Sequence, residues 1–269
     1  MQRTLSCPFF RKAFGWCVPI GGLGGLIGLG GGEFRLPVLM HAIGFDARAA
    51  IPLNLIVSLI TLSVAFIARG RAVPLAAIVP HLPEVLGLAA GGMASAFYGS
   101  GLVRRLNARA LVQAIAVLLA AIGALLLIET IVPFQPVAVL PASPASHLFV
   151  GIVIGSGIGL VSSVLGVAGG ELLIPTLIFV FSVDIRIAGA ASILISLAVV
   201  LIGLWRYWRL DAIPQGRGVQ RIALAMGLGS VIGATLGGLA IAYAPTGLLK
   251  LLLGGALIAA AGKTLISRK

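Results

Sequence analysis

Two glycine-rich stretches, each followed by a glutamate, are the residues of this chain best suited to chemistry. The first is GLGGGEFRLP from Gly28, and the second is GVAGGELLIP from Gly166. Glycine lets backbone approach a ligand closely, and a helix that starts at such a break directs N–H groups toward negative charge. The pattern predicts an anion-binding site, with close helix packing as the alternative role. The glycines expected to form it are Gly30, Gly31, Gly32, Gly169 and Gly170.

The glutamates of the two stretches, Glu33 and Glu171, lie in strongly apolar surroundings. A charged side chain near the middle of a membrane costs on the order of 3 kcal/mol or more, and such residues often mark ion or proton pathways. We expect at least one of them to be a proton carrier that couples anion movement to a proton gradient. A structural role is the alternative, because either could stabilise the first turn of a helix or pair with an arginine.

Composition indicates that membrane helices carry these stretches. The chain has 269 residues, of which 59% are hydrophobic and 10% charged, and its mean hydropathy is +1.16. Soluble domains have about a quarter of their residues charged. Segments 110–128, 188–205 and 222–243 contain no charged residue and approach or pass the roughly 18 to 20 residues of a membrane helix. The sequence predicts an all-α, multi-pass membrane protein.

The net charge of +12 reflects topology in this interpretation. Most Lys and Arg residues lie in short connections between apolar segments, where basic residues hold loops at the cytoplasmic side. No nucleic-acid partner is expected. Cys7 and Cys17 have no metal-ligand or disulfide spacing, so no cofactor is expected either.

The chain is predicted to be a duplication. One constant shift along the sequence places Gly28 on Gly166 and carries Asp46 onto Asp184. Each half contains four apolar segments, the first of which is long and interrupted at its glycines. Internal repeats of this kind are common in secondary transporters. The expected parts are repeat 1 (1–132), a linker (133–146) and repeat 2 (147–269).

Two topologies fit the eight segments. If every segment spans the membrane, the repeats are parallel. If each interrupted segment enters and returns as a hairpin, the repeats are inverted, and more Lys and Arg residues collect on one side. The positive-inside rule favours the inverted arrangement.

Further polar residues follow each interrupted segment. Asn54 and Ser192 occupy equivalent positions in the two repeats and are expected to donate hydrogen bonds to the anion. Asp46 and Asp184 are expected to cap the helices that follow them. Other hydroxyls that could join the site are Ser58, Thr61, Ser162, Ser163 and Ser196. Glycines at four-residue spacing, in the rows 151–159 and 229–237, are expected to pack helices together.

The chain resembles the TauE/SafE family of sulfite and organosulfonate exporters. The resemblance rests on GLIGLGGGEFRLPVLM from Gly25 with DARAAIPLN from Asp46, and on GVAGGELLIPTLI from Gly166 with DIRIAGAASILIS from Asp184. It implies a carrier of the bacterial inner membrane that exports sulfite, a sulfonate or a related sulfur-containing anion. Many members carry a hydrophobic residue where Glu33 and Glu171 stand here, so this chain resembles one subgroup.

Three other functions are weighed. An embedded enzyme is disfavoured because the chain contains neither HExxH nor GxSxG. A passive anion channel is a closer alternative, since broken helices suit pores as well as carriers. A membrane anchor for a sulfur-metabolising complex is the third. The sequence does not indicate an oligomeric state.

Overall fold

The protein is described by a computed structural model, which covers residues 7–102, 108–131, 143–165 and 167–266. Every regular element in these ranges is a helix, so the predicted all-α class is confirmed. The first half contains α1 (Cys7–Ile27), α2 (Gly32–Pro37), the π-helix η1 (Val38–Ile43), α3 (Ala47–Arg69), the 3₁₀ turns η2 (Leu75–Ala77) and η3 (Val79–His81), α4 (Leu82–Leu102) and α5 (Ala108–Ile131). The second half contains α6 (Pro144–Leu165), α7 (Gly170–Phe179), α8 (Ile185–Arg209), α9 (Arg217–Ala240) and α10 (Thr246–Ile266). Most of the expected linker, 133–142, lies outside the described residues.

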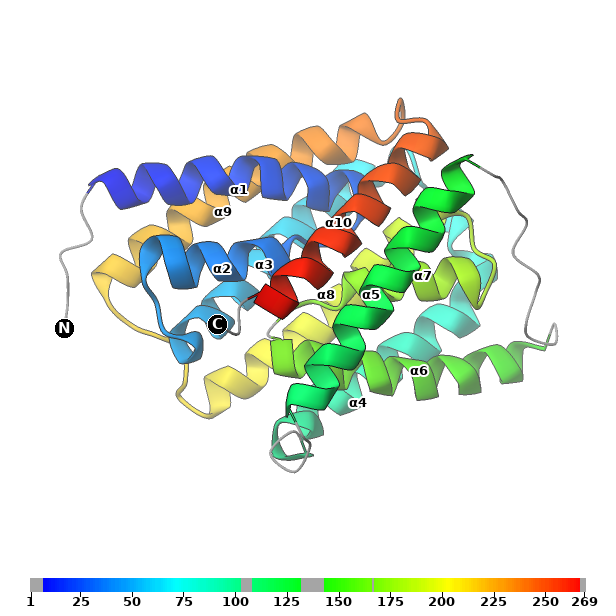
Figure 1. The fold of residues 1–269 in the computed structure, drawn as a ribbon, viewed down its shortest axis with the longest axis horizontal. Helices are drawn as coiled ribbons and strands as arrows, with labels where there is room; N and C mark the ends of the chain where they lie inside the picture. Colours follow the sequence, from blue (N-terminus) through cyan, green and yellow to red (C-terminus); the bar gives the residue numbers. More distant parts are fainter. Residues whose placement is uncertain (1–6, 103–107, 132–142, 166, 267–269) are drawn as a thin grey trace.

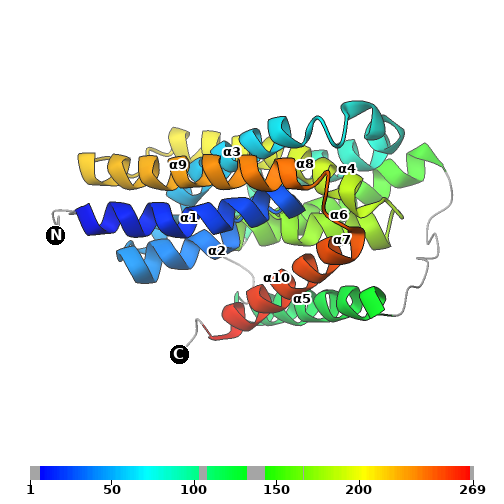
Figure 2. The same ribbon diagram turned by 90° about the horizontal axis from the view of Figure 1, so that it is seen from above.

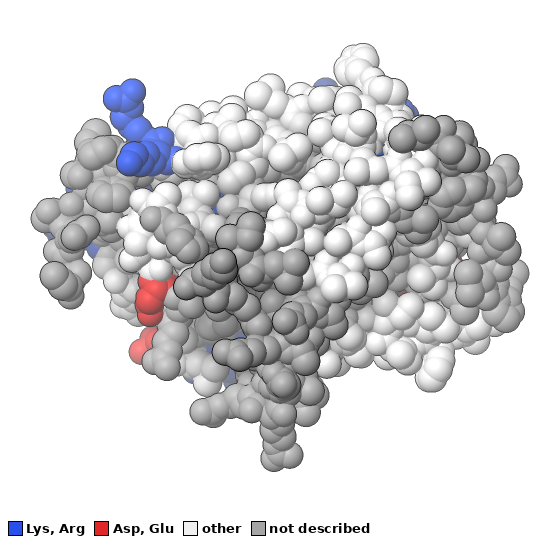
Figure 3. Space-filling view, viewed as in Figure 1, with Lys and Arg blue, Asp and Glu red and all other residues white. Residues whose placement is uncertain are grey.

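Four helices in the described ranges are long and apolar enough to cross a membrane. They are Ala49–Arg69, Pro144–Ser162, Ile185–Arg209 and Arg217–Ala240. Several large apolar side chains on α6 and α9 face outward, among them Phe149 at 69% exposure and Leu236 at 62%. Such surfaces suit contact with lipid chains. Figure 3 agrees, because the blue charged groups visible on that side gather mainly where α1 and α9 begin.

The long first and fifth segments of the prediction each correspond to two α-helices. Helix α1 ends at Ile27 and α2 begins at Gly32, while α6 ends at Leu165 and α7 begins at Gly170. Several helices of the second half start at a constant distance in sequence from their counterparts in the first half. The starts of α3 and α8 differ by the same offset that aligns the two glycine stretches, and so do the starts of α5 and α10.

Matching helices run in opposite directions. Arg69 at the end of α3 contacts Arg186 at the start of α8, and Leu55 near the start of α3 faces Gly203 near the end of α8. Figure 1 shows the same for α1 and α6, which cross the molecule from opposite ends. The start of α1, the loop before α3 and the end of α8 therefore lie at the same end of the molecule. We call this the basic end, because it carries the exposed residues Arg11, Lys12, Arg209, Arg217 and Arg221.

Glycine rows join two pairs of helices, as the sequence predicted. A methyl group at Gly233 or Gly237 of α9 would collide with backbone of α1, and one at Gly155 or Gly159 of α6 would collide with backbone of α4. Close backbone approach of this kind is how membrane helices associate when lipid supplies no hydrophobic drive. Helices α5 and α10 pair with each other and form a separate layer in Figure 2.

The second short helix lies at the centre of this assembly. Eight of the residues of α7 are buried, including Glu171 and the apolar run Leu172–Pro175. A helix that is buried all round must be enclosed by other helices. The second glycine stretch therefore continues into a helix that is shielded by its neighbours.

Candidate functional site

The two glycine stretches meet in the interior. A methyl group at Gly170 would lie 2.9 Å from the carbonyl oxygen of Leu29, and one at Gly32 would lie 3.7 Å from Cα of Val167. Two chain segments from different halves thus approach each other backbone to backbone. We call the residues between α1 and α2 (28–31) the first break, and those between α6 and α7 (167–169) the second break.

Only glycine suits the first position of the first break. Gly28 has φ +101, a backbone conformation that L side chains rarely adopt, and a methyl group there would collide with the carbonyl oxygen of Gly189 on α8. The N-cap residues of α2 and α7, Gly31 and Gly169, both have left-handed backbone as well. The local chemistry of glycine therefore explains why the chain turns at these positions.

A buried guanidinium lies directly beside the first break. Arg35 on α2 is fully buried, and its Nη2 atom donates to the carbonyl oxygen of Gly30 at 2.6 Å and to Oγ of Ser58 at 2.7 Å. Its Nη1 atom donates to Oγ1 of Thr61 at 2.6 Å and to Oγ of Ser230 at 3.2 Å. Its Nε atom donates to Oδ1 of Asn54 at 3.3 Å. All five acceptors are neutral.

Helix periodicity explains why α3 can supply three of these acceptors. Asn54, Ser58 and Thr61 are four and three residues apart, so they share one face of the helix, and all three are fully buried. Removing a cation from water costs several kcal/mol, and neutral hydrogen bonds recover only part of that cost. Five neutral acceptors do not cancel the positive charge of Arg35, and the nearby carboxylate of Glu33 makes none of these hydrogen bonds.

Arg35 is the functional candidate that the sequence reasoning missed. In the sequence it is a single basic residue inside an apolar segment. The shift that aligns the two glycine stretches places Leu173 at the equivalent position of the second half. A charge present in only one of two otherwise similar stretches is a signal that could have found it.

The structure separates the roles of the equivalent residues Asn54 and Ser192. The Nδ2 atom of Asn54 donates to the carbonyl oxygen of Gly32 at 3.0 Å, while its Oδ1 atom accepts from Arg35. Ser192 makes a long 3.4 Å hydrogen bond to the carbonyl oxygen of Gly28. Both are fully buried at the breaks, but only Asn54 contacts the guanidinium. Ser196, another predicted candidate, donates to Ala168 in the second break at 3.2 Å.

The two glutamates begin the short helices. Glu33 lies in the first turn of α2 and is half-buried, and its charge acts on Arg35 two residues later. Glu171 lies in the first turn of α7 and is 6% exposed. Carboxylates at these positions are stabilised by the helix dipole. The geometry therefore suits the structural alternative, and the proton-carrier role stays a prediction.

A second buried arginine binds the end of α1, just before the first break. Arg69 is the last residue of α3, and its Nη1 atom donates to the carbonyl oxygens of Gly25 and Leu26 at 3.3 and 3.4 Å. Its Nη2 atom donates to the carbonyl oxygen of Arg186 at 3.1 Å. A cation at the last carbonyls of α1 satisfies groups that the end of a helix leaves unpaired. Arg69 therefore holds α1, α3 and α8 together at the break.

A cavity of about 120 Å³ lies beside the second break. It is bounded by α3, α4, α6 and α8, and Val167 of the second break forms part of its wall. Most of the lining is apolar, and the polar side chains in it are Ser162, Arg206 and Tyr207. The side chain of Ser163, another predicted candidate, lies outside the described part of the chain. The two breaks themselves are packed together, so this space lies to one side of the point where they meet.

The predicted helix caps differ in outcome. Oδ1 of Asp184 accepts from the backbone N–H of Arg186 at 2.8 Å, which confirms the expected cap of α8. Asp46 occupies the N-cap position of α3, but its side chain makes no capping hydrogen bond, so that part of the prediction is wrong. Its backbone carbonyl accepts from Ala50 at 2.9 Å instead.

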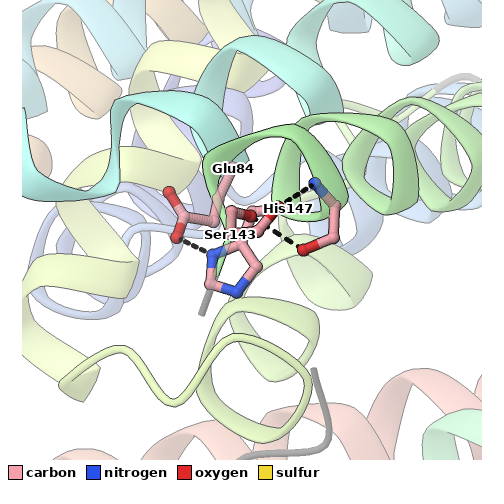
Figure 4. Close-up of polar contacts among 4 residues, drawn as sticks. Glu84, Ser143 and His147 are labelled. Atoms are coloured by element: carbon pink, nitrogen blue, oxygen red, sulfur yellow. Dashed lines mark hydrogen bonds and ion pairs between the residues drawn. The ribbon is translucent and has the colours of Figure 1, made fainter. Parts of the chain in front are cut away.

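A carboxylate–imidazole pair joins the starts of α4 and α6, at the end of the molecule opposite the basic end. Nδ1 of His147 lies 2.6 Å from Oε1 of Glu84, which is 4% exposed (Figure 4). The imidazole ring also packs edge-on against Phe181, 5.6 Å between ring centres. The pair is far from both breaks in sequence and links helices that already pack closely. We assign it a structural role.

No group of three His, Cys, Asp or Glu side chains that could hold a metal ion occurs within the described part of the chain. Searches of curated proteins and of solved structures gave no match. The family model described as "Sulfite exporter TauE/SafE" matches residues 13–264, nearly the whole chain. That match includes both glycine stretches, Arg35 and every helix from α2 to α9. The chain therefore belongs to the TauE/SafE sulfite exporter family, and it is a multi-pass membrane protein.

Proposed function

We propose that the protein is a secondary transporter of the plasma membrane that exports sulfite, an organosulfonate or a related sulfur-containing anion. The observation that carries the proposal is the buried guanidinium of Arg35, held by five neutral acceptors beside the first break. A cation in a low-dielectric interior attracts an anion far more strongly than one in water. Membership of an exporter family supports outward movement and a sulfur-containing anion.

The anion binds where the two broken helices meet. Gly30, Gly31 and Gly32 of the first stretch and Gly169 and Gly170 of the second bring backbone close to this point, and Asn54 positions Arg35. All donors of Arg35 have partners in this structure, so the anion must replace some of them. The hydroxyl of Ser58 is the simplest to displace, because it can rotate and donate to the anion, whereas the hydroxyl of Thr61 already donates to the carbonyl oxygen of Val57 at 2.7 Å.

The two halves form inverted repeats, and their exchange of positions supplies alternating access. The support is that α3 and α8 run antiparallel and keep the offset that aligns the glycine stretches, an offset that α5 and α10 share. Inverted repeats with binding at broken helices are a common plan for secondary transporters. The basic end faces the cytoplasm in this arrangement, in accord with the positive-inside rule.

Proton coupling is the remaining part of the proposal, with Glu33 or Glu171 as the carrier. Both lie within one turn of a break, and Glu33 is close enough for its charge to act on Arg35. A carboxylate beside the anion site can take up a proton when the anion leaves, so that the two movements are linked.

The test is transport by purified protein in liposomes. Radiolabelled sulfite, a short alkyl sulfonate, sulfate and thiosulfate are each followed with and without a pH gradient. We expect saturable movement of sulfite or the sulfonate that responds to the gradient. Large ohmic currents would instead indicate a channel, and the absence of transport by purified protein would indicate an anchor subunit.

A further inference from the structure

We infer that the cavity beside the second break is the passage between the basic end and the anion site, and that it admits a small, singly charged oxyanion. Ser162 forms its inner end and Arg206 forms its mouth. This inference rests on the proposed transport function and adds a route, two residues and a charge preference to it.

The cavity has the depth that such a passage needs. Its lining runs along α8 from Val199 to the C-cap residue Leu210, a separation of 11 positions (210 − 199) or about 16 Å of helical rise. Val199 is 7% exposed, whereas Leu210 is 66% exposed at the basic end. Half of a typical hydrocarbon core is about 15 Å. The space therefore reaches from the surface to about the middle of the membrane.

The inner end carries an unused hydroxyl. Ser162 is 4% exposed, and its Oγ atom is buried without a hydrogen-bond partner. A methyl group on Gly169, the N-cap of α7, would collide with this atom, so the hydroxyl points at the start of a ten-residue helix. The first N–H groups of a helix lack intrahelical partners and favour negative charge. A buried hydroxyl without a partner and a helix N-terminus, each of which favours an anion, thus lie at the same place.

The mouth carries a fixed positive charge. Nη1 of Arg206 on α8 donates to the carbonyl oxygens of Ala96 and Phe97 on α4, and the guanidinium lies 6.0 Å from the centre of the Phe97 ring. Arg206 is only partly buried, so it remains available to anions from water. A cleft with one sign of charge at its rim concentrates ions of the opposite sign.

The walls set the charge preference. Apart from Tyr207, the lining between Arg206 and Ser162 is apolar, with Leu55, Val199 and Val200 as examples. Transfer into apolar surroundings costs more for a dianion than for a monoanion, because the solvation that is lost grows steeply with charge. A monoanion such as methanesulfonate is therefore favoured over sulfate.

Thiol labelling tests the passage without requiring transport. Gly203 lines the cavity, and a methyl group there would have only Leu55 within 4 Å, at 3.8 Å. We expect Gly203→Cys, with Cys7 and Cys17 replaced by serine, to react with a charged, water-soluble thiol reagent from the basic end only. Gly157→Cys is the matched control, since it lies on the outside of α6 with nothing near it. It should not react from either side.

Methanesulfonate should slow the labelling of Gly203→Cys at a concentration at least about tenfold below that required of sulfate. Adding Ser162→Ala should raise the methanesulfonate concentration required by about three- to tenfold, the effect of one lost hydrogen bond. Labelling from the opposite end alone, no labelling, or equal protection by both ions would overturn the inference. If labelling behaves as expected but wild-type protein moves no anion, the passage stands and the proposed function fails.

Discussion

Nη2 of Arg35 donates a 2.6 Å hydrogen bond to the carbonyl oxygen of Gly30, and thereby ties a buried cation to the backbone of the first break. The same guanidinium is bonded to α3 through Asn54, Ser58 and Thr61, and to α9 through Ser230. One side chain thus joins the first break to the polar face of α3 and to helix α9. An anion that draws Arg35 away from any of these partners changes the contacts of all of them.

Arg35→Lys should destabilise the protein although it keeps the charge. An ammonium has three donors and cannot reproduce the planar fork that serves five acceptors here. Buried acceptors that lose their partners cost about 1 to 3 kcal/mol each. Thermal unfolding in detergent should show a clear loss of stability, whereas Arg71→Lys at an exposed turn should leave the melting temperature unchanged. Equal melting temperatures for both variants would contradict this view of the cluster.

The two equivalent polar residues should respond unequally to truncation. Asn54→Ala removes two hydrogen bonds, one to Gly32 and one to Arg35, and should lower the free energy of unfolding by about 2 kcal/mol or more. Ser192→Ala removes one long bond to Gly28 and should cost less than about 1 kcal/mol. Chemical denaturation of both variants measures the difference. Equal losses would contradict the unequal hydrogen bonding of the two residues.

Replacing Gly28 with alanine should be among the costliest small substitutions in the chain. Its φ of +101 strains any L side chain, and the new methyl group would meet backbone of Gly189. Overpacking of this kind costs about 1 to 3 kcal/mol before the strain is added. Gly255→Ala on α10 is the control, because nothing lies within 4 Å of the added methyl group. Removing a helix glycine there should stabilise by up to about 1 kcal/mol. A Gly28→Ala protein with the melting temperature of the wild type would refute the described contact.

Glu33→Gln and Glu171→Gln test the coupling. The amide keeps the shape of the side chain but cannot exchange a proton at working pH. Anion flux in liposomes should lose its response to a pH gradient in at least one variant, while both variants remain folded. If both retain the full response, the proton-carrier role is excluded and the position of each glutamate in a first helical turn suffices to explain it.

Patterns along the sequence were enough to predict the helical class, the membrane setting and the family. The glycine rows of α6 and α9 were interpreted correctly, because four-residue spacing of small residues has one common physical cause. The cap at Asp184 was also predictable, since the capping bond is local. The failure at Asp46 shows that the same residue type at the same position in a repeat need not make the same bond.

What could not be predicted depends on tertiary contacts. The Arg35 cluster joins α2, α3 and α9, and Ser230 is 195 residues from Arg35 in sequence. Arg69 lies at the end of an apolar segment, where a basic residue is expected to face water, yet it is 1% exposed and binds the end of α1. Both arginines lie inside the fold because particular carbonyl and hydroxyl oxygens surround them, and sequence spacing alone does not reveal such surroundings.

The account depends most on the claim that the anion binds next to the guanidinium of Arg35. The most direct test is the initial rate of radiolabelled sulfite efflux from liposomes that contain Arg35→Met protein, with Arg71→Met as the matched control. Both proteins are first shown to be folded by their elution and melting behaviour in detergent. We predict that efflux falls to the level of protein-free liposomes in Arg35→Met and stays at the wild-type rate in Arg71→Met. Wild-type efflux from folded Arg35→Met protein would contradict the account.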